Sequence, residues 1–130
     1  MNAKEFAPIV LRIGLALVLL WFGISQLVMP DNWVGWLPSW LPSFGLEPTT
    51  HVFINGGIET LLALSILAGL FTRAAATLAA VHMLAVVIAV VSVSGFDATA
   101  VRDVGVFVGI VAVALYGSDV WSLDTKRKAA

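Results

Sequence analysis

The chain alternates four long apolar stretches with shorter polar segments. The stretches cover residues 6–29, 52–71, 74–94 and 104–121. About 20 helical residues cross the roughly 30 Å hydrocarbon core of a bilayer, so each stretch is predicted to be a transmembrane helix. The short links after the second and third stretches make successive helices antiparallel neighbours. The pattern therefore predicts a single domain, residues 1–130, folded as an all-α, membrane-embedded, up-down four-helix bundle.

The first apolar stretch resembles a secretory signal in its position and hydropathy. Arg12 interrupts its apolar run, however, and no small-residue cleavage site follows it. We therefore expect this stretch to be a retained membrane helix.

The segment between the first two stretches has a different composition. Between Pro30 and Thr50 it carries four prolines and the tryptophans Trp33, Trp36 and Trp40. Proline breaks the hydrogen-bond ladder of a helix, and tryptophan prefers the boundary between membrane and water. We expect an interfacial loop that caps the bundle, with the three tryptophans as its anchors.

The composition supports a lipid environment and excludes several classes of function. Of the 130 residues, 60% are hydrophobic and 12% are charged, and the mean hydropathy is +1.00. A soluble domain of this size could not bury so much apolar surface. The net charge of −1 offers no basic field for nucleic acid. The chain has no cysteine, which excludes disulfides, thiolate metal sites and iron–sulfur clusters.

The basic residues predict an orientation. On one side of the membrane lie Lys4, Arg73, Lys126, Arg127 and Lys128, whereas Arg102 alone flanks the spans on the other side. Cytoplasmic segments carry the excess of lysine and arginine. Both termini are thus predicted to be cytoplasmic, with the tryptophan loop on the outer side.

Three ionisable residues stand out within the apolar stretches, namely Arg12, Glu59 and His82. Ionisable groups at this depth are costly and usually face protein or water. Helical rise puts Arg12 and His82 at similar depths and Glu59 somewhat further out, so the three are predicted to form one buried polar cluster, either an ion pair or a proton-handling site. The alternative is structural: Arg12 extends toward the headgroups, and Glu59 and His82 bond to neighbours.

A second set of polar residues gathers at the outer ends of the first, second and fourth stretches. Beneath the tryptophan loop these residues could line a shallow pocket for a quinone or a lipid headgroup. The alternative is ordinary helix capping, with Asp103 at the start of the fourth span as the partner of the helix dipole. The set comprises Ser25, Gln26, His51, Asn55, Arg102 and Asp103.

The sequence encodes no recognisable cofactor site. His51 and His82 lie at different depths, which disfavours a shared haem iron, and neither a phosphate loop nor a metal-ligand motif is present. A quinone is an expected ligand of the outer pocket, with a lipid headgroup as the alternative.

Several short motifs resemble the DoxX-like family of small four-helix membrane proteins. Arg12–Ala16 and Gly23–Leu27 are similar to the opening Arg-x-Gly-Leu-Ala and Gly-x-x-Lys-Leu patterns of that family. Gly57–Glu59 is similar to its glutamate helix, and Gly69–Arg73 to its Gly-Leu-x-Thr-Arg turn. Gly117 followed by Ser122, Leu123 and Asp124 also fits. Gln26 stands where many members have lysine, which puts in doubt any role that needs a cation there.

The resemblance implies a place in the plasma membrane of a prokaryote and a redox context. Some relatives are membrane subunits of a thiosulfate–quinone oxidoreductase, and others associate with redox or oxidative-stress enzymes. We therefore expect a membrane subunit or partner of a quinone-linked system, which is not an enzyme in isolation because the chain supplies no electron carrier. The alternative is a non-catalytic scaffold or a small-molecule or ion permeation element, acting with a protein partner or as a homo-oligomer.

Overall fold

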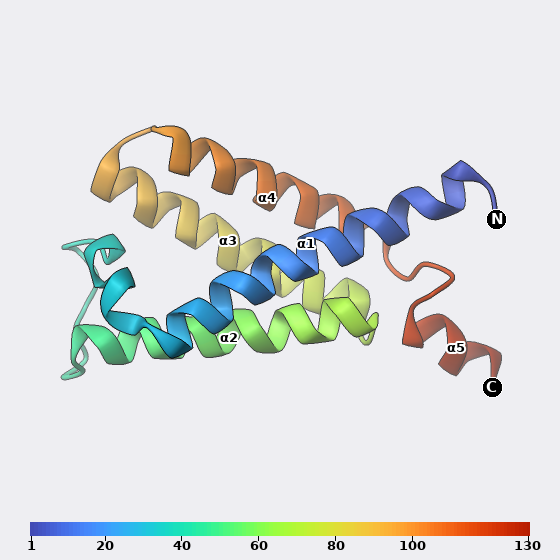
Figure 1. Cartoon of the computed structure of the whole chain (residues 1–130), viewed down its shortest axis with the longest axis horizontal. Coiled ribbons are helices and arrows are strands. Elements are labelled where there is room, and N and C mark those ends of the chain that lie inside the picture. The colour runs from blue at the N-terminus through green and yellow to red at the C-terminus, as the bar shows by residue number, and fades with distance from the viewer.

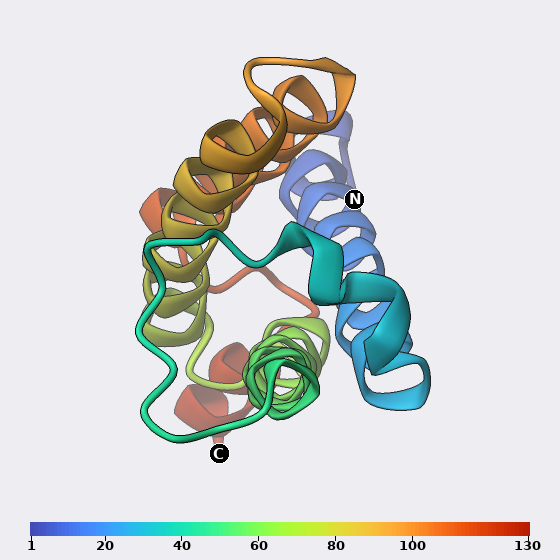
Figure 2. The same ribbon diagram turned by 90° about the vertical axis from the view of Figure 1, so that its left-hand side faces the viewer.

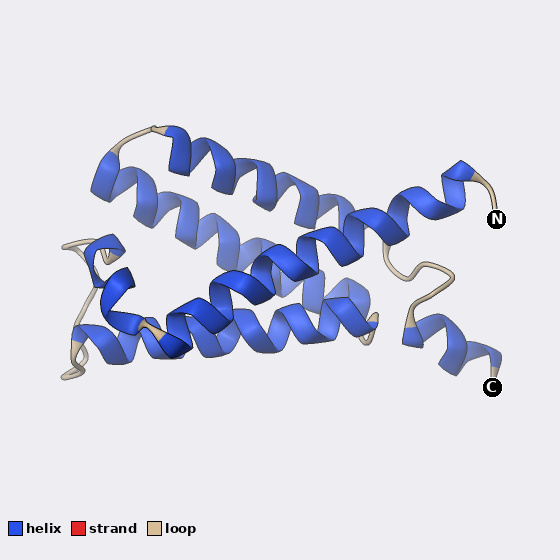
Figure 3. Cartoon of the chain, in the orientation of Figure 1, coloured by secondary structure: helices blue, strands red, loops and turns tan.

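The computed structural model covers residues 1–130 and consists of helices joined by loops, without a strand (Figure 3). Four of the helices are long and apolar enough to cross a membrane. The predicted all-α four-helix membrane bundle is thereby confirmed. The elements are α1 (Ala3–Val28), η1 (Pro30–Trp36), α2 (Pro48–Ala68), α3 (Thr72–Ser94), α4 (Ala98–Tyr116) and α5 (Leu123–Ala129).

The long helices form two antiparallel pairs. α1 packs mainly along α2, and α3 packs mainly along α4 (Figure 1). The N-terminus and α5 lie at one end of the bundle, here called the terminal end. η1 and the irregular loop of residues 37–47, here called the crossing loop, lie at the opposite end, here called the loop end (Figure 2).

Two glycines allow α1 and α2 to cross closely. A Cβ atom at Gly56 would lie 2.7 Å from the Cβ atom of Gln26 and 2.8 Å from the carbonyl oxygen of Gly23. Only a residue without a side chain fits such a crossing. The close approach places Gln26 directly against α2.

All four long helices begin before the residue that the apolar pattern predicts, α2 and α4 by the widest margin. α4 begins at Ala98 rather than near residue 104, because Asp97 caps it by accepting hydrogen bonds from the N–H groups of Thr99 and Ala100. These bonds lower the pKa of Asp97, with the bond from Ala100 as the largest cause. α2 begins with Pro48 at its first turn, where a missing N–H costs nothing.

The same two helices also end before the predicted spans end. α2 ends at Ala68 because Gly69 adopts the left-handed conformation, with φ of +67°. α4 is followed by Gly117, with φ of +81°. Hydropathy alone does not detect these stops, because apolar residues continue on either side of them.

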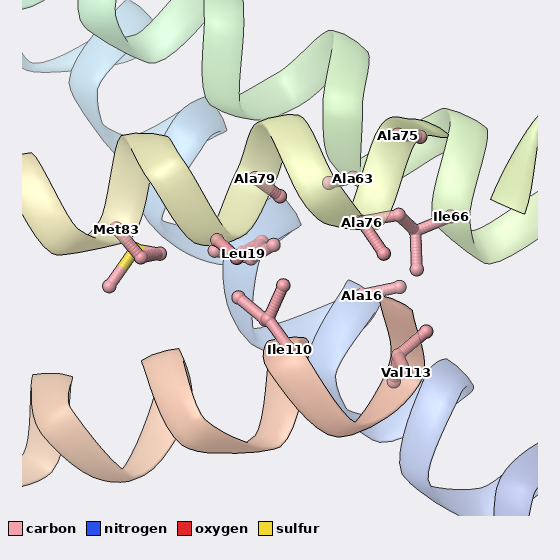
Figure 4. Close-up of a cluster of buried hydrophobic side chains, with 11 residues drawn as sticks. Ala16, Leu19, Ala63, Ile66, Ala75, Ala76, Ala79, Met83, Ile110 and Val113 are labelled. Carbon is pink, nitrogen blue, oxygen red and sulfur yellow. The ribbon is translucent and has the colours of Figure 1, made fainter. Parts of the chain in front are cut away.

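The apolar core fills the half of the bundle nearer the terminal end. Its centre is small-residue packing, with Ala75, Ala76 and Ala79 of α3 facing Ala63 of α2 and Ala16 of α1 (Figure 4). Ile110 and Val113 of α4 face α3 across the cluster, and Ile66 of α2 lies beside Ala76. The half nearer the loop end contains a cavity instead.

Candidate functional site

A cavity of about 530 Å³ opens in the loop end of the bundle. All four membrane helices line it, and η1 and the crossing loop cover it. Two tryptophans help to fasten the cover: Trp33 Nε1 donates to Ser25 Oγ (3.1 Å), and Trp40 Nε1 donates to Ser92 Oγ on α3 (3.1 Å). The sequence predicts Trp33, Trp36 and Trp40 as interfacial anchors. In the structure all three line the cavity.

The polar part of the cavity wall is centred on Glu59. Gln26 Nε2 donates to Glu59 Oε2 at 2.7 Å, and His82 Nε2 lies 3.3 Å from Glu59 Oε1. The side chain of Glu59 is 5% exposed and that of His82 is 17% exposed. A carboxylate and an imidazole thus face a largely apolar space, which is a suitable arrangement for accepting or releasing a proton.

The amide of Gln26 is oriented by its neighbours. Asn55 Nδ2 donates to Gln26 Oε1 at 2.7 Å, and Gln26 Nε2 also contacts the carbonyl oxygen of Phe22 at 3.2 Å. With its oxygen occupied by Asn55, Gln26 presents its N–H groups to Glu59. Gln26 therefore donates to the carboxylate without a positive charge.

The only cation lining the cavity wall is Arg102. Its Nε donates to Asp103 Oδ1 at 2.8 Å, and its guanidinium lies 4.8 Å from the centre of the Phe22 ring. The Phe22 ring packs edge-on against Trp33. Asp103 is buried in the second turn of α4, so the predicted role of Asp103 as partner of the helix dipole is wrong: Asp97 caps that helix.

The structure brings most of the predicted outer pocket together. Gln26, His51, Asn55, Arg102 and Asp103 all line the cavity. Ser25 lies behind the wall, where it holds Trp33. His51 Nε2 contacts the carbonyl oxygen of Ser43 in the crossing loop at 2.9 Å, so part of its ring is used to hold the cover.

The predicted cluster of Arg12, Glu59 and His82 is divided between two places. Arg12 forms an ion pair with Asp119, with distances of 2.6 Å from Nε to Oδ2 and 3.1 Å from Nη2 to Oδ1. Its Nη1 donates to the carbonyl oxygens of Ile66 and Leu67 at the end of α2. Ile66 lies seven residues after Glu59, which is about 10 Å along the helix. Because Arg12 binds at Ile66, it does not reach Glu59, and the prediction that Arg12 faces Glu59 is wrong.

Asp119 falls inside the predicted fourth span, residues 104–121, yet the sequence prediction did not include it in the buried polar cluster. In the structure it lies in the link between α4 and α5. Arg12 and Asp119 are 2% and 3% exposed. Asp119 lies between Gly117 and Ser122, within the ending that resembles the DoxX-like family. A buried arginine in a span needs an anionic partner, and this was the signal that could have directed attention there.

The same link fastens the turn between α2 and α3. Asp124 accepts from the N–H groups of Phe71 and Thr72 and from the Thr72 hydroxyl, at 2.7–2.9 Å. Burial by itself raises the pKa of Asp124, but these hydrogen bonds outweigh it and leave the pKa below its ordinary value of 3.8. This terminal-end network is separate from the cavity.

The comparisons with known proteins agree with the fold and its motifs. The sequence pattern of the DoxX family matches residues 7–92, a range that includes Gln26, Glu59 and His82. No curated protein and no solved structure matches the chain. Since the family match covers more than half of the chain and four helices can cross a bilayer, the protein is a multi-pass membrane protein that belongs to the DoxX family.

Proposed function

We propose that the cavity at the loop end binds the head of a membrane quinone, and that the protein serves as a membrane subunit or partner of a quinone-linked redox system. The observation that carries the proposal is the pairing of Glu59 with His82 on the wall of a mainly apolar cavity. Its volume of about 530 Å³ lies in the range typical of small-molecule sites.

The walls suit an amphiphile that enters from the bilayer. Ile54 and Ile58 on α2 both line the cavity and are 48% and 43% exposed, so the cavity reaches the lipid-facing surface beside α2. An apolar tail can leave the bundle there, while the ring lies among the tryptophans. Aromatic side chains favour offset or edge-on packing with such a ring.

The polar groups match the chemistry of the head. A quinone takes up two electrons and two protons to become a quinol, and in the reverse direction the quinol hydroxyls release those protons. Glu59 and His82 can accept or supply the protons at the ring oxygens. The electrons are exchanged with the redox cofactor of a partner enzyme, because the chain has no cysteine and encodes no cofactor motif.

The first test is direct binding. A short-tailed quinone analogue is titrated into detergent-purified protein while tryptophan fluorescence is recorded, because three tryptophans line the cavity. We expect saturable quenching, and a Kd raised about 10- to 100-fold in Glu59→Gln, the equivalent of one hydrogen bond to a charged group. Glu47→Gln is the matched control, since Glu47 is exposed at the same end and does not line the cavity.

The second test is purification from native membranes, with analysis of lipids and proteins that accompany the chain. Quinone in the extract together with a redox enzyme would support the proposal. If the extract contains no quinone and the titration shows no saturation, the proposal fails. A stable partner without quinone would instead favour the scaffold alternative.

We further propose that the terminal end faces the cytoplasm of a prokaryotic cell. The predicted excess of basic residues supports this orientation. The absence of cysteine makes it easy to test: single variants Ser39→Cys and Ala129→Cys are labelled in intact cells with a membrane-impermeant thiol reagent. Labelling of residue 39 alone is expected, and labelling of residue 129 alone would reverse the orientation.

A further inference from the structure

A second cavity, of about 680 Å³, lies at the terminal end of the bundle. It is bounded by the start of α3, the end of α4 and the helix α5, so it is separate from the proposed quinone site. Three of its lining residues are basic, namely Arg73, Arg127 and Lys128, and one is acidic, namely Asp124.

The three cations have no acidic partner. The ion pairs of the structure join Arg12 to Asp119, His82 to Glu59 and Arg102 to Asp103, and none includes a residue of this cavity. Both carboxylate oxygens of Asp124 are already occupied by Phe71 and Thr72. Three basic residues against one acidic residue leave the cavity with a net positive charge.

Two of the cations are held in place by neighbouring groups. The Arg73 guanidinium lies against Gly117, where a Cβ atom would be 3.2 Å from Nη2, and Nη2 is 3.4 Å from the carbonyl oxygen of Leu115. The Arg127 guanidinium lies 5.5 Å from the centre of the Phe71 ring. Arginine held in this way retains free N–H groups, whose planar fork matches the oxygens of a phosphate.

The rim of the cavity continues onto the membrane surface. Phe71 and Tyr116 are 61% and 55% exposed, and Leu115 beside them is 76% exposed. Aromatic residues at the ends of membrane helices lie at the level of the lipid headgroups, and the apolar side chains next to them face acyl chains. A phosphate held by the cations would thus have its acyl chains alongside α3 and α4.

We propose that this basic cavity binds the phosphate headgroup of an anionic phospholipid. Charge, position at the headgroup level and an adjoining apolar surface all favour a lipid over a freely dissolved anion. Basic cavities at the ends of membrane helices recognise lipid headgroups through the same forces. The bound lipid would join α3, α4 and α5 and add to the contacts that Asp124 makes between them.

The test is native mass spectrometry of the detergent-purified full chain, with added phosphatidylglycerol, phosphatidylcholine or inorganic phosphate. We expect phosphatidylglycerol to bind in preference to phosphatidylcholine. Arg127→Gln and Lys128→Gln should each weaken its binding about fivefold, and the double variant about 25-fold. Lys126→Gln is the matched control, because it removes the same charge from the same helix and Lys126 does not line the cavity.

Each remaining outcome overturns the proposal. Equal binding of the two lipids would show that no anionic headgroup is recognised. An equal effect of Lys126→Gln would show that general charge attraction, rather than the cavity, retains the lipid. Displacement of the lipid by millimolar phosphate would assign the site to a free anion. Helix content measured by circular dichroism confirms that each variant is folded, since Arg127 and Lys128 are both exposed.

Discussion

The ion pair between Arg12 and Asp119 gives the most direct test of the structure. Arg12→Met leaves the Asp119 carboxylate buried, with only the N–H of Trp121 at 2.9 Å still bound to it. It also removes the donor that serves the carbonyl oxygen of Leu67. Removing one partner of a buried ion pair costs about 3–5 kcal/mol, and we expect a loss of this size in the free energy of unfolding.

Asp119→Asn should cost less. Arg12 keeps its bonds to the carbonyl oxygens of Ile66 and Leu67, and its charge remains close to the negative end of the α2 dipole. The expected loss is about 2–3 kcal/mol. The double variant should cost little more than Arg12→Met alone, because neither charge then remains buried without a partner. The coupling energy should therefore be about 2 kcal/mol.

The Arg12 and Asp119 variants form a double-mutant cycle, and the matched comparison is a second double-mutant cycle that combines Arg12→Met with Glu59→Gln. Arg12 binds carbonyl groups that begin about 10 Å along α2 from Glu59, and the two side chains share no hydrogen-bond partner, so their effects should add within about 0.5 kcal/mol. The free energies are measured by titrating the protein with a denaturing detergent in mixed micelles and following helix content by circular dichroism. Strong coupling of Arg12 to Glu59, or none to Asp119, would refute the structural assignment.

Three further variants test other parts of the fold. Gly56→Ala should lower the free energy of unfolding by about 1–3 kcal/mol, because the new Cβ atom would collide with Gln26, whereas Gly57→Ala has open space around it and should have no such effect. Because the pKa of Asp124 is lowered in the folded protein, its carboxylate stabilises the fold above pH 3.8, and this contribution is lost as the pH falls through the lowered pKa. Asp124→Asn should therefore reduce the melting temperature at pH 7. A difference in melting temperature that persists at about pH 2 would contradict this reasoning. Trp40→Phe removes the bond between the crossing loop and α3, so hydrogen exchange in that loop should become faster, and unchanged exchange would show that this bond does not hold the cover.

The four helices, their order and the absence of a long helix between the first two could be predicted from the sequence because they depend on local properties. Hydropathy over about 20 residues identifies a span, and the prolines between Pro30 and Thr50 exclude a long helix there. The outer polar residues could also be grouped correctly, since the ends of antiparallel helices bring Gln26, Asn55 and Arg102 to one level. The predicted helix ends were less accurate, because α4 begins where the Asp97 side chain caps it and α2 ends where Gly69 adopts a left-handed backbone conformation. Hydropathy detects neither feature.

The partners of the buried charges were decided only by the tertiary structure. Depth estimated from sequence put Arg12 near His82, but α1 extends past the end of α2, and this shift brings Arg12 to the last carbonyl groups of that helix. Its anionic partner then comes from a link that folds back after α4, over a sequence distance that no local pattern encodes. The sequence places Arg12 in an apolar span, where its buried charge needs an anionic partner. The relative shift of the packed helices determines which carboxylate reaches it.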